Sequence, residues 1–473
     1  MIINSFNETI CAPATSSGTG AVSIVRVSGP DSLAIADKVV RLRKGTVTDV
    51  PGYSVHYGSV YEGAEELDQV LVTVFRSPLS YTGEDSVEIS CHASNYIVQR
   101  IMFLLIEAGA RAAEPGEFTK RAFVNGKMDL AQSEAVADLI SSGSKAAHRI
   151  ALNQLRGGYS EELQKMRSKL LEITSLMELE LDFSEEDVQF ADRSELKRLT
   201  DEACSLISSL AGTFRLGNAI KNGVPVAIVG AVNSGKSTLL NALLGEDRAI
   251  VSDIAGTTRD TVEETMTIGS TLFRFIDTAG IREASELVER LGIERTFKKI
   301  SQADIVIAVV DMSLPLEQIK ADVKVILDSV DFASQQVVIV GNKADISGVN
   351  KNVRGILKFV SSIDNEGVNP LFVEISALTG FGVPELKELL EKTQYNRIDA
   401  SSSLLVSNAR HYAELTAAHQ DLKEVRKALD TSLSTELIAQ DLRSALAHLG
   451  AITGEYTTDE VLGQIFSHFC IGK

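Results

Sequence analysis

The sequence lacks the features that stabilise small secreted proteins or place a protein in a membrane. It has four cysteines in 473 residues, and Cys11, Cys91, Cys204 and Cys470 form no C-x-x-C pair. A disulfide framework or a zinc site is therefore not expected, and reduced thiols are typical of cytosolic proteins. No apolar run is long enough to cross a bilayer, and the first residues resemble neither a signal peptide nor a transit peptide. We expect a cytoplasmic globular protein that makes no membrane contact.

Basic residues are also scarce. Lys and Arg number 46 against 64 Asp and Glu, so the formal net charge at pH 7 is −18. This balance excludes a broad basic surface that grips nucleic acid by itself. Any contact with RNA must be local or shared with a partner. With 44% hydrophobic residues, a chain of this length should form two or three domains, each with its own core.

The first part of the chain, residues 1–120, has the pattern of a small α+β domain. Apolar residues gather in short runs at 21–27, 70–75 and 87–90, which predicts strands. Helical spacing over 96–108 predicts a helix between these strands and the next part of the chain. The pattern itself names no ligand.

Helical spacing dominates two stretches, residues 121–218 and 391–473. The helices expected there cover 131–140, 145–181, 194–210, 409–429, 435–448 and 458–468. The helical pattern breaks around 214–223. Long amphipathic segments of this kind pack as antiparallel bundles. We expect the two stretches to form the two parts of one helical domain.

Residues 219–390, between the two helical stretches, alternate strands with helices. The apolar strand runs cover 226–229, 272–276, 305–310, 336–340 and 371–375. This alternation predicts a doubly wound, mostly parallel sheet that binds its ligand at the carboxyl ends of the strands. The fold class is therefore multidomain, with an α/β domain inserted into a helical domain and an α+β domain before both. Movement driven by that ligand can then pass from the inserted domain to the bundle.

A glycine-rich loop, Gly230-Ala-Val-Asn-Ser-Gly-Lys-Ser237, follows the first strand of this α/β domain and leads into a helix. Glycines let backbone N–H groups close around phosphates, and the helix N-terminus adds positive potential. Lys236 would reach the β- and γ-phosphates, and Ser237 would ligate Mg²⁺. The loop residues predicted to contact the nucleotide are Asn233, Ser234, Gly235, Lys236, Ser237 and Thr238.

Two later motifs predict how the base is recognised. Asn342-Lys343-Ala-Asp345 follows a strand, and the Asp345 carboxylate can accept hydrogen bonds from N1–H and the exocyclic amine of guanine. Adenine does not present this pair of donors, so the site selects GTP over ATP. Ser376-Ala377-Leu378, at another strand end, would close over the base with its backbone amides.

Two more motifs concern the γ-phosphate. In Asp277-Thr-Ala-Gly280, Asp277 can hold the Mg²⁺ shell and Gly280 can approach the γ-phosphate. Thr258, in Gly256-Thr-Thr-Arg-Asp260, is placed to complete the Mg²⁺ shell when that phosphate is present. Many Ras-type GTPases then place Gln where this chain has Ile281. Because isoleucine cannot orient water, hydrolysis must use another polar group and another positive charge.

The motifs together resemble the MnmE (TrmE) family of tRNA-modification GTPases. The resemblance rests on the loop with Asn233, on residues 252–260 and 277–289, and on Phe469-Cys-Ile-Gly-Lys473. It covers the whole chain, because Ser80-Tyr-Thr-Gly-Glu-Asp85 and the segment from Pro115 to Leu130 also match.

The resemblance implies a potassium ion beside the phosphates. The Asn233 side chain and oxygens of Ser252, Ile254 and Thr257 would hold the ion. A fixed cation there would offset the charge that develops on the phosphates, as an arginine finger does in other GTPases. Family members often have Thr where this chain has Ser252, a mild change if the ligand is a backbone carbonyl.

By the same resemblance, Glu289 would position or polarise the attacking water, acting with Lys236 and Thr258. On spacing alone, Glu289 reads instead as a surface carboxylate on a helix. Ser252 and Thr257 would also lie beside the bound GTP.

The resemblance further implies that the N-terminal domain binds 5-formyl-tetrahydrofolate or a related folate and mediates homodimerisation. Arg26, Glu88, Lys127 and Lys473 match the family's folate-contacting positions. From the sequence alone each is an ordinary charged residue, usually solvated. Their folate role therefore rests on the family.

Cys470 is fourth from the end, but Gly472 and Lys473 do not fit a prenylation box. The family pattern favours a reactive or substrate-facing thiol with a role in catalysis. An inert cysteine is the alternative, since nothing nearby in the sequence indicates an activated thiolate.

The function implied is that of a potassium-stimulated GTPase acting on tRNA with a flavin-containing partner of the MnmG type. Together they would add an aminomethyl or carboxymethylaminomethyl group at C5 of the wobble uridine, and GTP hydrolysis would pair and separate the GTPase domains. Two alternatives remain. A ribosome-assembly GTPase would carry a basic RNA-binding appendage such as a KH domain. A membrane-remodelling GTPase would carry an apolar or strongly basic lipid-facing segment.

Overall fold

The computed structural model divides the chain into two compact units. The first comprises residues 1–140, 154–204 and 417–473, and the second comprises residues 141–153 and 205–416. The structure describes residues 7–16, 18, 20–182, 193–245, 264–269, 271–276, 300–332, 334–346, 350–361, 370–398, 404–431 and 435–472.

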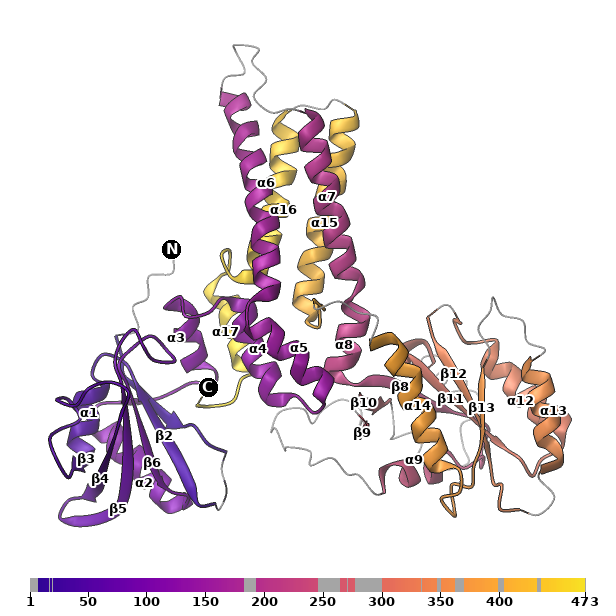
Figure 1. Ribbon diagram of the computed structural model, residues 1–473, viewed down its shortest axis with the longest axis horizontal. Helices are drawn as coiled ribbons and strands as arrows, with labels where there is room; N and C mark the ends of the chain where they lie inside the picture. The colour runs from indigo at the N-terminus through magenta and orange to yellow at the C-terminus, as the bar shows by residue number, and fades with distance from the viewer. Residues whose placement is uncertain are drawn as a thin grey trace. The chain divides into compact units, whose positions relative to one another are not determined.

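The first unit contains a seven-stranded sheet in the order β3-β4-β5-β6-β2-β1-β7 (Figure 1, indigo). Its strands are β1 (Ile10–Pro13), β2 (Val22–Ser28), β3 (Val40–Leu42), β4 (Ser54–Glu62), β5 (Glu65–Phe75), β6 (Ser86–His92) and β7 (Arg111–Ala112). Neighbouring strands are antiparallel except for the parallel pair β1 and β7. The α+β pattern expected for the N-terminal domain is confirmed.

The two faces of this sheet differ, as strand β5 illustrates. Val70 and Val72 are buried, whereas Leu71 between them is exposed. Successive side chains of a strand point to opposite faces, so this alternation gives the sheet one apolar inner face. Helices α1 (Ser32–Val39) and α2 (Asn95–Glu107) pack on that face and complete the core.

The rest of the first unit is helical. Its helices are α3 (Glu117–Val124), α4 (Leu130–Ser141), α6 (Gly158–Asp182), α16 (Thr435–Thr453) and α17 (Asp459–Ser467). Helices α6 and α16 pack along each other, and α17 contacts α3. Helices α5 (Lys145–Leu155), α7 (Arg193–Gly212) and α15 (Ala409–Asp430) have residues in both units, and Ser141 at the end of α4 also belongs to the second unit.

The second unit contains a six-stranded sheet in the order β13-β12-β11-β8-β10-β9. Its strands are β8 (Val224–Val229), β9 (Glu264–Ile268), β10 (Thr271–Phe275), β11 (Ile305–Asp311), β12 (Gln336–Asn342) and β13 (Leu371–Glu374). All neighbours are parallel except β9 and β10. The mostly parallel sheet predicted for this part of the chain is confirmed, with β9 as an additional edge strand.

Helices cover both faces of the second sheet. They are α8 (Phe214–Asn222), α9 (Lys236–Leu244), α12 (Leu316–Leu327), α13 (Asn350–Ser361) and α14 (Val383–Ile398). One core cluster joins α9 and α14 to the sheet, and another joins α12 and α13 to its other face. Strands β11 and β12 are almost wholly buried, which explains their uninterrupted apolar sequences.

Two expectations about the helices were wrong. The helix predicted over 145–181 is two helices, because Gly157 between α5 and α6 has a left-handed φ of +88°. The break expected around 214–223 is instead helix α8, where the Phe214 ring stacks on Tyr412 at 4.4 Å between centroids. Gly217 lets this helix approach the backbone of Val406 closely. Among the described helices, none combines the length and hydropathy needed to cross a bilayer.

Candidate functional site

The glycine loop joins β8 to α9 with the backbone that a phosphate cradle requires. Gly230 and Gly235 have φ values of +154° and +97°, and Asn233 between them is left-handed at +61°. A Cβ atom on Gly230 would overlap the Val309 carbonyl, and one on Gly235 would overlap the Asn342 side chain. Glycine is therefore required at both positions by space as well as by φ.

Lys236 begins helix α9 and turns its side chain back over the loop. Its Nζ donates hydrogen bonds to the carbonyl oxygens of Gly230 at 3.0 Å and Ala231 at 2.7 Å. Ser237 follows it in the first turn of α9 and is half-buried, and Thr238 is exposed. The arrangement places an ammonium group at a helix N-terminus that is itself suited to anions.

The side chain of Asn342, at the end of β12, links two loops. Its Nδ2 donates to the carbonyl oxygen of Ser234 at 2.9 Å, and its Oδ1 accepts the backbone N–H of Ala377 at 2.9 Å. Asn342 is 3% exposed, so neither bond competes with bulk water. The buried side-chain amide of Asn342 thereby links the glycine loop to the loop after β13.

Asp345 lies on the surface beside the loop that follows β13. Ser376 Oγ donates to Asp345 Oδ1 at 2.6 Å and fixes the direction of the carboxylate. Leu378, in the same loop, is 80% exposed. An exposed carboxylate flanked by an exposed apolar side chain is suited to a planar base with donor groups on one edge.

Lys343 forms an ion pair that the sequence analysis did not anticipate. Its Nζ lies 2.5 Å from Asp311 Oδ2, at the end of the neighbouring strand β11. Burial favours a higher pKa for the Asp311 carboxyl, but hydrogen bonds from Lys343 and Ser313 outweigh it, so the pKa is lowered. Lys343 has a left-handed φ of +69°, and the pair holds this uncommon backbone in place.

The structure brings together the predicted nucleotide residues at the carboxyl ends of three parallel strands. These are Asn233, Ser234, Gly235, Lys236, Ser237 and Thr238 after β8, Asn342, Lys343 and Asp345 at β12, and Ser376, Ala377 and Leu378 after β13. The other predicted residues lie outside the described part of the chain. They are Ser252, Ile254, Thr257, Thr258, Asp277, Gly280 and Glu289.

A second group of predicted residues lies on the N-terminal sheet. Arg26 of β2 and Glu88 of β6 occupy paired positions on neighbouring strands, and Arg26 Nη2 lies 2.8 Å from Glu88 Oε1. The Arg26 guanidinium carbon lies 5.4 Å from the centroid of the Tyr81 ring and 5.5 Å from that of Phe118. Both distances are within cation–π range. Two aromatic rings and an ion pair thus converge at one place.

The end of the described chain reaches this group. Arg26 Nη1 donates to the carbonyl oxygen of Gly472 at 3.5 Å, and Lys127 Nζ donates to that of Pro78 at 2.9 Å. Cys470 is exposed and unbridged, and its carbonyl oxygen accepts the Gly116 N–H at 3.4 Å. Lys473 lies outside the described residues.

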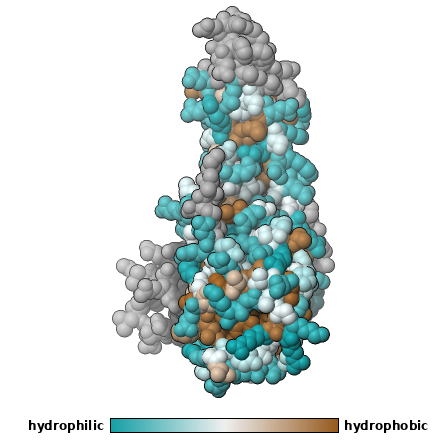
Figure 2. Space-filling view, turned by 90° about the vertical axis from the view of Figure 1, so that its left-hand side faces the viewer, coloured by the Kyte–Doolittle hydropathy of each residue, from teal (hydrophilic) through white to brown (hydrophobic). Residues whose placement is uncertain are grey.

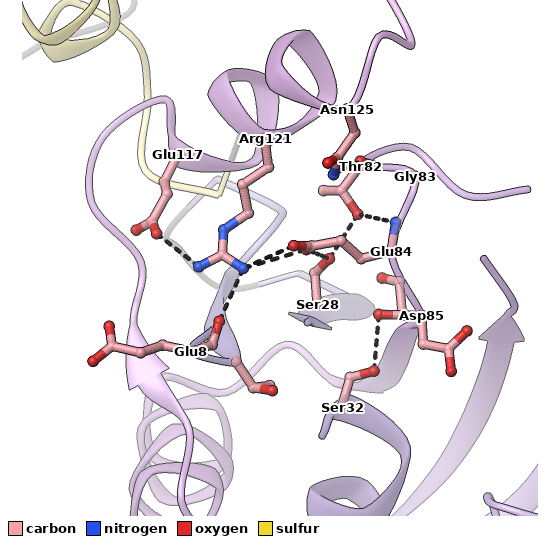
Figure 3. Close-up of polar contacts among 12 residues, drawn as sticks. Glu8, Ser28, Ser32, Thr82, Gly83, Glu84, Asp85, Glu117, Arg121 and Asn125 are labelled. Atoms are coloured by element: carbon pink, nitrogen blue, oxygen red, sulfur yellow. Dashed lines mark hydrogen bonds and ion pairs between the residues drawn. The ribbon is translucent and has the colours of Figure 1, made fainter. Parts of the chain in front are cut away.

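The same domain contains a buried polar network around Arg121 (Figure 3). Arg121 of α3 is fully buried, and its guanidinium lies between the carboxylates of Glu84 and Glu117. Glu117 also pairs with Arg111 at 2.6 Å. Burial favours a higher pKa for the Glu117 carboxyl, but bonds from Arg111, the Glu114 backbone and Arg121 outweigh it and lower the pKa.

Tyr81 and Phe118 are not among the site residues predicted from the sequence. Both lie inside segments noted for the family resemblance, and an aromatic residue within a polar motif was the available signal. Asp311 was missed because an aspartate at the end of an apolar strand is common in α/β domains. Its contact with Lys343 depends on the pairing of β11 with β12.

Comparison with known families covers almost the whole chain. Residues 9–127 match the family described as GTP-binding protein TrmE N-terminus. Residues 130–470 match the MnmE helical domain. The two matched regions together contain all the candidate residues except Lys473.

Individual relatives named tRNA modification GTPase MnmE align with the chain from end to end. The protein of Bacteroides fragilis is 49% identical over 468 residues, which is 98% of this chain and 99% of that protein. That of Parabacteroides distasonis is 50% identical over 470 residues, 98% and 100% of the two chains. That of Christiangramia forsetii is 48% identical over 474 residues, 99% of each.

Solved structures match a part of the chain. The G domain of the T. maritima FeoB iron transporter is 28% identical, with 36% of this chain and 99% of that chain covered and a TM-score of 0.26. Era, solved in complex with MgGDPNP and nucleotides of 16S ribosomal RNA, is 27% identical, with 42% and 66% covered and a TM-score of 0.28.

The family matches cover more than half of the chain, and relatives at about half identity span its full length. The elements of the structure follow the same order along the chain as the matched families. An α+β domain comes first, and a GTPase sheet then lies in sequence between helical segments. The chain therefore belongs to the MnmE family of tRNA modification GTPases and is a GTPase that acts in tRNA modification.

Proposed function

We propose that this GTPase is stimulated by potassium and acts with a flavin-containing partner of the MnmG type at C5 of the tRNA wobble uridine. The group added is aminomethyl or carboxymethylaminomethyl, and a folate supplies its one-carbon unit. The observation that carries the proposal is the convergence of the glycine loop, Asp345 and the 376–378 loop at one sheet edge, in a chain of this family.

Each end of the nucleotide has its own support in the second unit. Lys236, already turned toward the loop carbonyls, would exchange those contacts for the β- and γ-phosphates. Asp345, oriented by Ser376, would accept the two donors on the guanine edge. Asn342 keeps the two ends in register, since it bonds to both loops.

Magnesium and potassium suit the donors that the loop offers. Ser237 has its hydroxyl in the first turn of α9, and Asn233 carries an exposed amide in left-handed backbone. Bound magnesium and potassium would supply positive charge that offsets the charge developing on the phosphates. Hard oxygen donors of this type are what both cations prefer. The other proposed ligands, Thr258 for magnesium and Ser252, Ile254 and Thr257 for potassium, lie outside the described residues.

Water activation is assigned to Glu289. The residue after Asp277-Thr-Ala-Gly280 is isoleucine, which offers no hydrogen bond to water. Another polar group must therefore orient the water, and Glu289 occupies the position to which the family resemblance gives this role. Thr258 and Lys236 complete the proposed catalytic group.

The group around Arg26 supports the folate half of the proposal. A 2-amino-4-oxo pteridine presents two N–H donors on one edge and a flat apolar face. Glu88 Oε2 accepts no hydrogen bond from a described residue, whereas Oε1 is held by Arg26. That free oxygen suits the pteridine edge, and the rings of Tyr81 and Phe118 suit its face. Lys127 and Lys473 are the proposed partners of the ligand's carboxylates.

The N-terminal sheet supports dimerisation. Its outer face carries Val55, Tyr57 and Leu71, of which Val55 is 60% and Leu71 is 48% exposed. Figure 2 shows apolar residues grouped among hydrophilic ones on the surface of this domain. Exposed apolar groups on neighbouring strands are typical of a contact surface, and a second copy of the chain is the proposed occupant. Pairing of the GTPase domains would depend on the nucleotide.

The proposed location is the cytoplasm, where tRNA and GTP are available. The four cysteines are unbridged, as expected in a reducing compartment. A local or shared RNA contact also agrees with the net charge of −18, because the partner would supply part of the tRNA-binding surface.

Reconstitution tests this function directly. The purified chain is combined with an MnmG-type flavoprotein, GTP, potassium, a folate one-carbon donor and undermodified tRNA, and the tRNA nucleosides are analysed by mass spectrometry. The proposal predicts a C5-modified wobble uridine that requires every component. Unmodified uridine in the complete mixture, with GTP hydrolysed, would refute the wobble-uridine assignment and leave the GTPase activity in place.

A further inference from the structure

Two segments that carried the family resemblance, residues 80–85 and 115–130, are joined to each other by a buried ion pair (Figure 3). Arg121 is 0% exposed, and its Nη1 lies 3.1 Å and 3.3 Å from the two carboxylate oxygens of Glu84. The two residues are 37 positions apart in sequence. Burial of such a pair is costly, and apolar replacements are often at least as stable, so a role beyond stability should be sought.

The Arg121 guanidinium is fixed from its other side as well. Its Nη2 donates to Glu117 Oε1 at 3.0 Å, and its Nη1 also donates to the carbonyl oxygen of Glu8 at 2.9 Å. Glu117 belongs to the same helix as Arg121, whereas Glu84 belongs to a loop. One guanidinium therefore has a helical support on one side and the loop on the other.

The loop from Arg76 to Asp85 is braced internally. Ser77 Oγ donates to the Gly83 carbonyl oxygen at 2.9 Å, and the Ser77 backbone N–H donates to Asp85 Oδ1 at 2.8 Å. Ser80 Oγ donates to the Glu84 carbonyl oxygen at 2.5 Å. Because these bonds tie the ends of the loop together, a displacement of Glu84 should move the whole loop.

Glu84 also connects the loop to strand β2. Ser28 Oγ donates to Glu84 Oε2 at 2.8 Å and lies 2.7 Å from Thr82 Oγ1. Asn125, after α3, donates to the Thr82 carbonyl oxygen at 2.7 Å. The loop is thus held between β2 and α3, with Glu84 bonded to Ser28 of β2 and to Arg121 of α3.

The loop carries Tyr81, which lies in the group around Arg26 that is proposed to bind folate. The Tyr81 hydroxyl lies 2.9 Å from Thr119 Oγ1 of α3, and its ring lies beside the Arg26 guanidinium. Lys127 contacts the start of the loop, because its Nζ donates a hydrogen bond to the Pro78 carbonyl oxygen. Two side chains of the candidate folate site therefore depend on where this loop lies.

We propose that Arg121 and Glu84 are positioning residues for ligand binding in the N-terminal domain. Their ion pair sets the place of the 76–85 loop, and the loop presents the Tyr81 ring as a stacking face for the planar ring of a folate-class ligand. This inference rests on the folate part of the proposed function and adds the control of the Tyr81 ring position by the ion pair of Arg121 and Glu84.

Two charge-neutral variants of the same network test the proposal. Glu84→Gln weakens the bond between Arg121 and the loop, and Glu117→Gln weakens the bond between Arg121 and its own helix. Both glutamates contact the same guanidinium, so a purely structural role predicts similar effects on stability and on binding. The full-length protein is used, with 5-formyl-tetrahydrofolate affinity measured by calorimetry, unfolding by thermal scans, and backbone order by hydrogen exchange.

The expected result is a split between the two variants. Glu84→Gln should weaken ligand binding about 10-fold, the effect of losing one charged hydrogen bond, and should speed amide exchange in residues 77–85. Glu117→Gln should lower the unfolding temperature but leave the affinity within about twofold of wild type, since no loop contact is lost. Tyr81→Leu should also weaken binding, because it removes the stacking ring itself while the bonds of Glu84 to Arg121 remain.

Other outcomes separate the two proposals. Equal affinity losses in both glutamate variants, or an unchanged affinity in Glu84→Gln, would overturn the positioning role. If the wild type binds no 5-formyl-tetrahydrofolate, the folate assignment fails. In that case, faster amide exchange of the loop in Glu84→Gln alone would still show that the ion pair of Arg121 and Glu84 controls the loop. Unchanged amide exchange in Glu84→Gln would refute this control too.

Discussion

Asn342 and Ser234 are joined by a hydrogen bond that connects the base end of the proposed nucleotide site to its phosphate end. The Asn342 Nδ2 atom donates to the Ser234 carbonyl oxygen at 2.9 Å, while its Oδ1 accepts the Ala377 N–H. Both polar ends of a buried amide are therefore used. A disturbance at this amide should affect the whole site, because no water replaces a lost partner in the interior.

Gly235→Ala should disrupt the site through this amide. The new Cβ would overlap Asn342 Nδ2, and φ at position 235 is +97°. We expect GTP binding to weaken about tenfold or more, measured with a fluorescent GTP analogue. Gly212→Ala is the matched control, since a Cβ there meets no atom within 4 Å and affinity should stay unchanged. Equal affinities of the two variants would contradict the assigned packing.

Asp345→Asn should change which base the site accepts. The amide no longer receives both guanine donors, and two hydrogen bonds to a charged group contribute about 1.5–3 kcal/mol each. We expect GTP affinity to fall about 100-fold or more, and xanthosine triphosphate, which carries an oxygen in place of the exocyclic amine, to compete better than with wild type. Competition binding measures both effects. Glu388→Gln, at an exposed carboxylate on α14, should leave them unchanged.

Glu117 should make the first unit sensitive to acid. Its pKa is lowered in the folded protein, because bonds from Arg111, the Glu114 backbone and Arg121 outweigh the effect of burial. A carboxyl with a lowered folded pKa adds stability above its unfolded pKa, about 4.3, and loses it as pH falls through the folded value. Below about pH 4, the unfolding temperature of the wild type should therefore fall more steeply with decreasing pH than that of Glu117→Gln. Parallel curves for the two proteins would contradict this assignment.

The cysteines should differ in reactivity toward alkylating agents. Cys470 is exposed, whereas Cys11 and Cys91 are buried. Burial raises the pKa of the Cys11 thiol to about 11, and burial together with Asp68 raises that of Cys91 to about 11. At pH 7.5 iodoacetamide should label Cys470 in the folded protein and the other two after unfolding, as read by peptide mass spectrometry. Early labelling of Cys11 or Cys91 would contradict the burial described.

Cys470→Ser then separates the two interpretations of the tail thiol. If Cys470 takes part in chemistry, the serine variant should lose tRNA modification while it retains GTP turnover. An inert cysteine predicts that both activities survive. The reconstituted reaction with tRNA nucleoside analysis distinguishes these outcomes.

The phosphate loop was predictable because its physics is local. A run of buried strand residues, two glycines and a helix start already dictate the turn, and Gly230 and Gly235 have the positive φ values that it needs. The location of the residues proposed to bind the base was predictable for a related reason. Parallel strands bring their carboxyl ends to one edge, so Asp345 and Ser376 meet there.

Contacts between distant segments were not predictable from one sequence. The pairing of Glu84 with Arg121 depends on how the loop after β5 meets α3, and no local pattern specifies this contact. Helix α8 was missed because its glycine and asparagine are poor helix formers, and packing of Phe214 on Tyr412 overrides that preference. Strand β9 was missed because its polar residues give a weak strand signal.

GTP turnover in KCl against NaCl tests the proposed potassium-assisted GTPase most directly, with light scattering in GDP, aluminium and fluoride as a transition-state mimic. We expect GTP turnover to be about tenfold or more faster in KCl, because potassium would supply positive charge at the phosphates. We also expect light scattering to show a larger particle when the transition-state mimic forms in potassium. Asn233→Ala should remove the difference between the salts. Equal turnover in both salts, with no change in particle size, would contradict the cation-assisted pairing of GTPase domains.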